Sequence, residues 1–170
     1  MALTTVTRTY LELAPDVAFT RASVPEDCAW RELEGSAWRH SRSLYAEVGA
    51  DYHWYDRLPW PDAQWEGLMA SPDTRVFVLD LAGRRAGYVE LARTDDSVEI
   101  AYFGLLGFAQ GRGLGRWMLE RAIAEAQAWG ARRVWLHTCT LDSPVALPNY
   151  LARGFQVVRT EQYELEVPPA

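Results

Sequence analysis

The sequence predicts an α+β fold with a mixed, mostly antiparallel sheet, and three observations lead to this fold class. First, strand-like stretches at residues 75–81, 85–91 and 98–106 follow one another through short turns, which is typical of an antiparallel meander. Second, a glycine-rich stretch leads into a helix at residues 114–129, whose apolar side chains recur at helical spacing. Third, a further strand-like stretch follows at residues 133–140. A strand–helix–strand crossover makes its two strands parallel, so the sheet contains both orientations.

The same signals place the remaining elements. β-branched and aromatic residues before Pro15 predict a first strand at residues 4–13. The segment after Gly154 predicts a terminal hairpin that runs to residue 167. Helices are expected at residues 17–34, 36–48, 61–69 and 144–153.

Length and composition narrow the class of protein. A chain of 170 residues with 49% hydrophobic and 24% charged residues is typical of one soluble globular domain, here residues 1–170. A net charge of −6 argues against a nucleic-acid partner. No stretch has the apolar length of a signal peptide or a membrane span, so we expect no membrane partner and a cytoplasmic protein.

The two cysteines do not indicate a disulfide framework or a metal site. Cys28 and Cys139 are far apart in the sequence and have no neighbours with ligand-like spacing. We expect both to be small, buried, reduced side chains. No metal is predicted.

The junction between the strand at residues 98–106 and the following helix is the most informative stretch. It reads Gln110, Gly111, Arg112, Gly113, Leu114, Gly115, Arg116. The first N–H groups of a helix have no backbone acceptor and carry partial positive charge, so this junction predicts a phosphate or pyrophosphate cradle. Gly115 is not followed by Lys and Ser or Thr, which excludes a nucleotide P-loop. Arg116 stands where a dinucleotide fingerprint needs its third glycine, which excludes that motif.

What remains is Gln-x-x-Gly-x-Gly, and it resembles the acyl-CoA pyrophosphate motif of the GNAT superfamily of N-acyltransferases. Gln110, Gly113 and Gly115 match its fixed letters. A second motif of that family is similar to residues 143–155. Its matching residues are Ala146, Tyr150, Gly154 and Phe155, whereas Ser143 stands at the asparagine position.

The resemblance implies a GNAT-like sheet with a splayed parallel pair flanked by helices, and an N-acetyltransferase that uses acetyl-CoA as co-substrate. It implies direct attack by the primary amine of a small molecule in a ternary complex, and homodimers are common in the family. A backbone N–H near Leu105 or Leu106 would bind the oxyanion, residues 110–116 would bind the cofactor, and Tyr150 would be the general acid.

The general base has three candidates. Glu99 is favoured because many members of the family carry a glutamate there and because its apolar neighbours would raise its pKa. Glu90 on the preceding strand and His137 on the following one are alternatives. Each of the three also has a structural interpretation, in which the glutamates face solvent and the histidine is a core residue.

An aromatic-rich loop at residues 51–60 is the candidate substrate-binding segment. Its rings, with Tyr52 and Trp54 foremost, suit recognition of an aromatic or cationic acceptor. The alternative is that Trp54 and Trp60 fill the core under a loop. Two other functions also remain open, namely a non-catalytic acyl-CoA-binding module and transfer of a longer acyl group.

Overall fold

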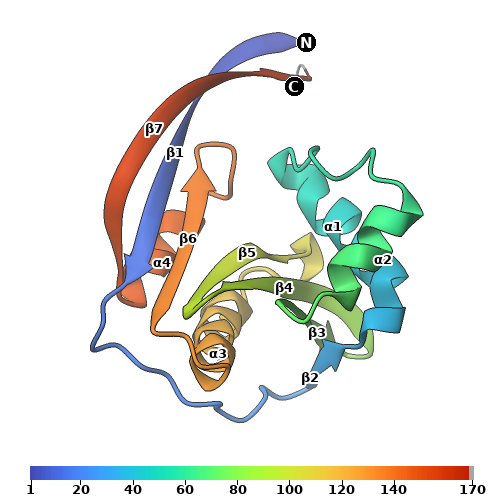
Figure 1. Ribbon diagram of the computed structural model, residues 1–170, viewed down its shortest axis with the longest axis vertical. Coiled ribbons are helices and arrows are strands. Elements are labelled where there is room, and N and C mark those ends of the chain that lie inside the picture. The colour runs from blue at the N-terminus through green and yellow to red at the C-terminus, as the bar shows by residue number, and fades with distance from the viewer. Residues whose placement is uncertain (169–170) are drawn as a thin grey trace.

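The computed structural model describes residues 1–168, which form one seven-stranded sheet in the order β2-β3-β4-β5-β6-β1-β7 (Figure 1). The strands are β1 Ala2–Leu13, β2 Cys28–Leu33, β3 Thr74–Leu81, β4 Arg84–Thr94, β5 Ser97–Leu105, β6 Arg133–Cys139 and β7 Phe155–Val167. The helices are α1 Trp38–Gly49, α2 Asp62–Ala70, α3 Leu114–Ala128 and α4 Ala146–Ala152. Short 3-10 turns lie at Gly35–Ala37, Ala50–Tyr52 and Gly107–Ala109.

All neighbouring strands are antiparallel except β5 and β6, which confirms the predicted mixed sheet. The parallel pair is short: only residues 97–99 of β5 are bridged to residues 133–135 of β6. A register shift opposite Glu90 and Leu91 leaves Ala101 as an extra residue in β5, which is a β-bulge. The strands therefore separate just beyond Glu99.

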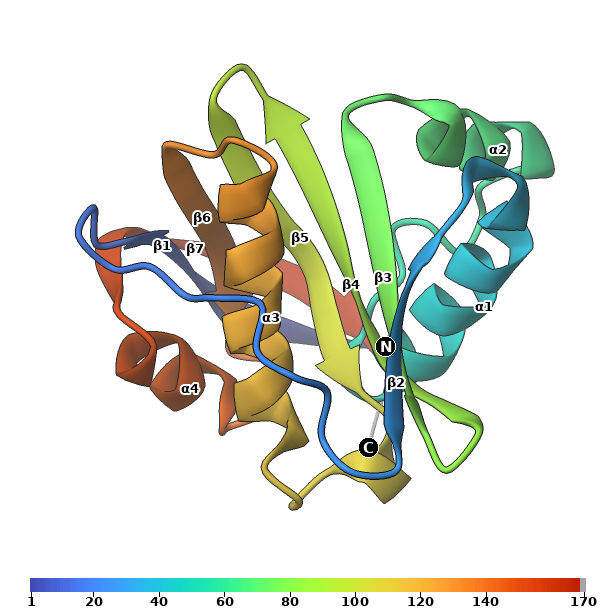
Figure 2. The same ribbon diagram turned by 90° about the horizontal axis from the view of Figure 1, so that it is seen from below.

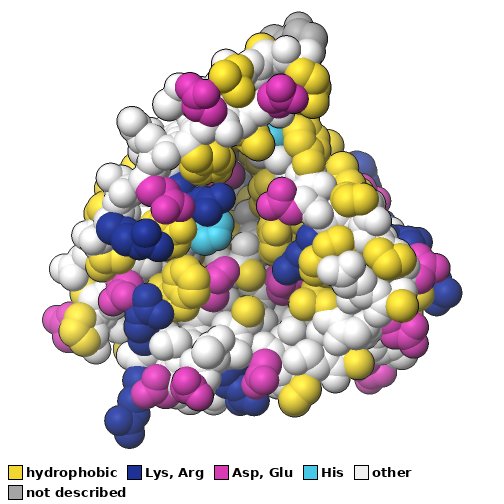
Figure 3. Space-filling view, turned by 45° about the horizontal axis from the view of Figure 1, so that its top comes forward, with side chains coloured by type: hydrophobic (Ala, Val, Ile, Leu, Met, Phe, Trp, Pro, Cys, Tyr) yellow, Lys and Arg dark blue, Asp and Glu magenta, His cyan; other side chains and the backbone are white. Residues whose placement is uncertain are grey.

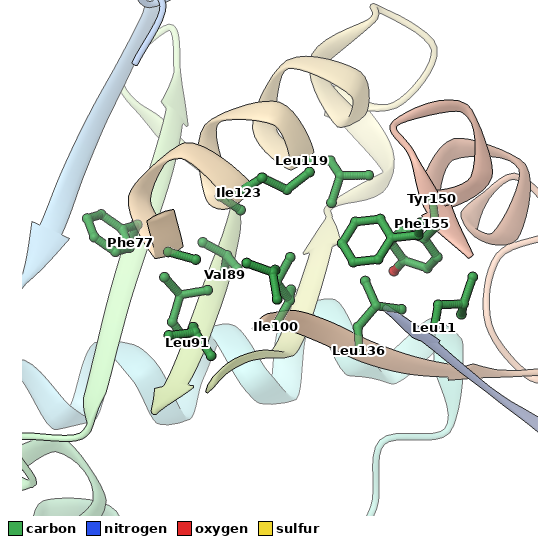
Figure 4. Close-up of a cluster of buried hydrophobic side chains, with 14 residues drawn as sticks. Leu11, Phe77, Val89, Leu91, Ile100, Leu119, Ile123, Leu136, Tyr150 and Phe155 are labelled. Carbon is green, nitrogen blue, oxygen red and sulfur yellow. The ribbon is translucent and has the colours of Figure 1, made fainter. Parts of the chain in front are cut away.

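Helices cover the two faces of the sheet (Figure 2). On one face α3 and α4 pack on the strands, and α1 and α2 lie on the other face over β3 to β5 (Figures 1 and 2). Figure 4 shows the first core cluster, in which Leu119 and Ile123 of α3 meet Ile100 of β5 and Leu136 of β6. In the second cluster, Leu44 of α1 and other side chains from α1 and α2 pack on β3 and β4.

Two predicted elements are wrong, and Cys28 and Cys139 are half-buried instead of buried. The helix expected at residues 17–34 is absent, because residues 28–33 form β2 along the edge of β3. Trp30 stacks on Phe77 at 5.4 Å between ring centroids, and this contact with the sheet overrides the weak local helix signals. The terminal hairpin is instead one strand, β7, which pairs with β1 over its whole length.

The other predicted elements are confirmed to within a few residues. The helix α3 begins after Gly113 and ends before Gly130, and both glycines have positive φ, 77° and 97°. Within residues 1–168, no helix has the length and apolar character needed to cross a membrane.

Candidate active site

The gap between β5 and β6 brings free backbone groups to the centre of the sheet. The Leu106 N–H points toward β4 and donates to the Ala86 carbonyl at 2.7 Å. Because antiparallel strands alternate the side to which successive residues direct their polar groups, the Leu105 N–H points the other way, into the gap. The sequence named Leu105 and Leu106 as candidate oxyanion donors. Only the Leu105 N–H is directed into the gap, because the Leu106 N–H is bonded to the Ala86 carbonyl.

The glycine-rich turn at the start of α3 lies beside this gap. Gly111 and Gly113 have φ of 75° and 77°, which side chains rarely tolerate, and a Cβ added to either would meet no atom within 4 Å. The backbone N–H groups of residues 111–116 donate to no acceptor within residues 1–168. The turn thus presents unpaired N–H groups at a helix start, an arrangement that can bind an anion and that is called the cradle below.

Charged side chains flank the cradle. Arg112 is exposed, and Arg116 is also exposed, with its Nε 3.6 Å from Glu120 one helical turn away. Leu114 differs from both, because its side chain is buried against Met118 and only its N–H faces the cradle. The two guanidinium groups can add positive charge beside the free N–H groups.

Gln110 joins the cradle to the loop at residues 51–60. Its Nε2 donates to the Leu105 carbonyl and to the Tyr52 hydroxyl, each at 3.1 Å. A Cβ on Gly104 would lie 3.9 Å from the Tyr52 ring, so this ring packs across β5 at the gap. Tyr52 therefore stands at the border between the cradle and the face covered by α1 and α2.

Tyr150 lies on α4 with its ring in the core. It packs against Phe103 and Phe155, with centroids 6.3 Å and 6.0 Å away, and Figure 4 shows it with Phe155 near Leu136. Burial, and then the charge of Asp142, raise the pKa of Tyr150 well above that of an ordinary tyrosine. Its hydroxyl therefore keeps its proton throughout the neutral range, as a proton donor must.

Glu99 occupies the last paired position before β5 and β6 separate. It lines a cavity of about 310 Å³ together with Trp135, Arg133, Ala92 and residues 94–97 of the β4–β5 turn. Burial, followed by the nearby charge of Glu90, raises the pKa of Glu99 above its ordinary value. A carboxylate with a raised pKa is a better proton acceptor near neutral pH.

Glu90, an alternative base, is already engaged. Its side chain is almost fully buried, and both carboxylate oxygens accept hydrogen bonds from Arg57, at 2.6 Å and 2.9 Å. A bidentate pair of this kind stabilises the carboxylate and occupies the atoms that would take up a proton. Glu90 is therefore poorly suited to act as a base.

His137, the other alternative, lies on β6 opposite Tyr10 of β1, with ring centroids 5.6 Å apart. Desolvation, and then the Arg8 guanidinium, lower the pKa of His137. Its side chain shares the face of Trp135, the partner of Glu99, because alternate residues of a strand share a face. Figure 3 shows one face of the molecule with a central hollow, around which acidic, basic and histidine side chains gather.

The aromatic residues of the loop mostly pack inward. Trp54 and Trp60 are partly buried in the cluster under α1 and α2, and a Cβ on Gly49 would come within 2.5 Å of Trp54. Trp54 thus fills space as in the structural alternative, although its neighbour Tyr52 reaches the cradle.

Two residues that the sequence did not single out contribute to this region. Arg57 pairs with Glu90, and Asn149 donates from its Nδ2 to the Gly115 carbonyl at 3.3 Å, which ties α4 to α3. Their partners are 33 and 34 residues away, so no local pattern could have found them. Ser143 accepts a hydrogen bond from the Val145 N–H before α4.

Comparisons with known proteins identify the family. The sequence model of the acetyltransferase (GNAT) family matches residues 29–155. An uncharacterized N-acetyltransferase from Mycobacterium tuberculosis is 30% identical over 104 residues, which cover 61% of this chain and 66% of that protein.

Solved structures agree on the fold. A GCN5-related N-acetyltransferase from Sphaerobacter thermophilus superposes with a TM-score of 0.72 at 17% identity, over 94% of this chain and 51% of the other. A relative from Kribbella flavida gives a TM-score of 0.64 at 22% identity, over 99% of this chain and 61% of the other. The chain thus spans slightly less than two thirds of the Mycobacterium relative and about half of the Sphaerobacter protein. Because the family's sequence model matches well over half of its residues, the chain belongs to the GNAT family of acetyltransferases.

Proposed function

We propose that this protein transfers an acetyl group from acetyl-CoA to the primary amine of a small molecule, by direct attack in a ternary complex. One observation carries the proposal: β5 and β6 separate after three paired positions, beside a helix start with free N–H groups. Acetyl-CoA carries a thioester and a pyrophosphate on one molecule. A site for it therefore needs an open gap for the thioester and an anion cradle for the pyrophosphate.

The cradle suits the pyrophosphate of acetyl-CoA. The N–H groups of residues 111–116 would hold its oxygens, and the open space above Gly111 and Gly113 would admit them. Arg112 and Arg116 would add charge. The bound co-substrate supplies an activated acyl group, and the protein supplies position, charge stabilisation and proton transfer.

Three groups would carry the chemistry. Glu99 accepts a proton from the amine, so that the nitrogen lone pair can form the new C–N bond. The Leu105 N–H stabilises the negative charge that develops on the carbonyl oxygen. Tyr150 donates a hydrogen bond and then its proton to the sulfur as the C–S bond breaks. Its raised pKa makes it a weaker acid, so the transfer depends on the negative charge that develops on the leaving sulfur.

A thiol-release assay tests the proposal. Acetyl-CoA is supplied with a panel of primary amines, secondary amines and alcohols, and calorimetry measures acetyl-CoA binding separately. We expect micromolar binding and amine-dependent release of CoA thiol. Tight binding without turnover on any acceptor would instead indicate a non-catalytic acyl-CoA-binding module. Faster release from longer acyl-CoA donors would show that the acyl group is not acetyl.

A further inference from the structure

Arg57 sits in a site built to hold a cation. Its guanidinium forms the bidentate pair with Glu90, whose side chain is 2% exposed, and the Arg57 side chain is itself only 13% exposed. Four aromatic rings surround the charge. The distances from the guanidinium carbon to the ring centroids are 4.4 Å for Tyr102, 4.8 Å for Trp60, 5.7 Å for Trp65 and 6.0 Å for Tyr45. Glu90 and these four rings are called the cation cage below.

Glu90 and three of the four rings come from helices and strands, whereas Trp60 and the occupant, Arg57, come from a loop. Tyr45 lies on α1, Trp65 on α2, and Glu90 and Tyr102 on adjacent strands, where they are direct cross-strand partners. Arg57 belongs to residues 53–61, which have neither helix nor strand. Each cation–π contact stabilises the enclosed cation, and a buried charge that loses its partner is strongly destabilising. The cage therefore holds this loop at Arg57, in addition to the packing of Trp54 under α1 and α2.

The attached loop faces the hollow beside the proposed reaction centre. Tyr102 lies on the same face of β5 as Glu99, and the Arg57 N–H donates to the Tyr45 hydroxyl at 3.1 Å. The loop thus forms one wall of the space in which an amine must approach.

We propose that Arg57 is a positioning residue of the acceptor site: its guanidinium fills the cation cage and holds residues 53–61 as the wall that an incoming amine contacts. The role in acceptor binding rests on the proposed acetyl transfer, but the existence of the cage does not. Arg57 itself touches no reacting atom.

The first experiment tests the cage without any enzyme activity. In Arg57→Ala the cage is vacated, so methylguanidinium at millimolar concentration should bind and give a saturable change in tryptophan fluorescence through Trp60 and Trp65. The native protein and Arg42→Ala, which removes an exposed arginine–carboxylate pair between α1 and α2, should give none. The double variant with Glu90→Gln should also lose the response. If folded Arg57→Ala responds to methylguanidinium no more strongly than to sodium chloride, the proposed cation cage is ruled out.

The second experiment tests the attachment of the loop. Glu90→Gln leaves Arg57 in place but removes its charged partner, so trypsin should cleave the bond after Arg57 about tenfold faster than in the native protein. Mass spectrometry follows the peptide that ends at this residue, with Arg42→Ala as control. Cleavage at the native rate contradicts the attachment.

The third experiment tests the acceptor role, with the best amine from the panel. Arg57→Ala should raise the KM for this amine about tenfold and leave the Kd of acetyl-CoA within about threefold. Methylguanidinium should restore the KM. If Arg57→Ala does not fold, Arg57→Lys takes its place, since it keeps the charge but not the bidentate geometry and should raise the KM by a smaller factor. An unchanged amine KM in a variant that binds methylguanidinium overturns the acceptor role and leaves the acetyl transfer itself untouched.

Discussion

The proposed cofactor side and the proposed acceptor side of this protein are built in different ways. The cradle at residues 110–116 is one continuous run, and its donors are backbone N–H groups presented by glycines with positive φ. The acceptor side is assembled from side chains distant in the sequence, as in the pair of Arg57 with Glu90 and the bond between Tyr52 and Gln110. A site made of backbone leaves a readable motif. A site made of side chains that are distant in the sequence leaves no such motif, and single substitutions can change its specificity.

The largest effect is expected at the cradle, where Gly113→Glu should abolish acetyl-CoA binding. A carboxylate placed about 4 Å from a phosphate opposes it by about 4 kcal/mol at a protein surface, which is roughly a 1,000-fold loss of affinity. Calorimetry measures the Kd. Gly83→Glu is the matched control, because Gly83 has a similar φ of 79° and equally open surroundings in the β3–β4 turn. An equal loss in both variants would mean that strain, not charge, is responsible.

The next effect concerns chemistry at the gap. Tyr150→Phe should reduce kcat about 100-fold, because it removes the proposed acid and keeps the ring that packs on Phe155. The Kd of acetyl-CoA should stay within about twofold. A native kcat in Tyr150→Phe would show that this hydroxyl is only part of the core.

Glu99→Gln separates the proposed base from its alternatives. Burial raises the pKa of Glu99, so the carboxylate that accepts the proton is lost as the pH falls through this raised value. We expect kcat/KM to fall about tenfold near neutral pH and to lose its acid limb. Exposed Glu164 gives the control variant, Glu164→Gln. An acid limb that survives in Glu99→Gln but disappears in His137→Gln would assign the base to the histidine.

The stability of Glu99→Gln should change in the opposite direction to its activity. A carboxyl whose pKa is raised by folding stabilises the fold only at low pH, and that contribution is lost as the pH rises through the folded-state pKa. At neutral pH the native protein therefore holds an ionised, partly buried Glu99 at some expense of stability. Urea unfolding at pH 7 should show Glu99→Gln to be at least as stable as the native protein, and a large loss of stability would contradict this account.

The contrast between the two sides also explains what the sequence could predict. The core stripe of α3, with Leu114, Met118, Ala122 and Ala126, follows from local periodicity, and all four side chains are buried. β2 was mistaken for a helix because its burial depends on Trp30 meeting Phe77, 47 positions further along the chain. The ion pair between Arg57 and Glu90 could likewise not be predicted, because nothing in the local sequence distinguishes a paired carboxylate from a free one.

The smallest effect tests whether the cradle, although built of backbone, also depends on a distant side chain. Asn149→Ala removes the hydrogen bond from α4 to the Gly115 carbonyl, a contact worth about 1 kcal/mol in a typical protein. The first turn of α3, which forms the end of the cradle, would lose this one hydrogen bond but keep its N–H groups. The affinity for acetyl-CoA should therefore fall only about threefold. Leu151→Ala is the control, since this residue is 47% exposed on the same helix. A loss near 100-fold, measured by calorimetry, would instead mean that Asn149 contacts the co-substrate directly, and the cradle would then share the side-chain construction of the acceptor side.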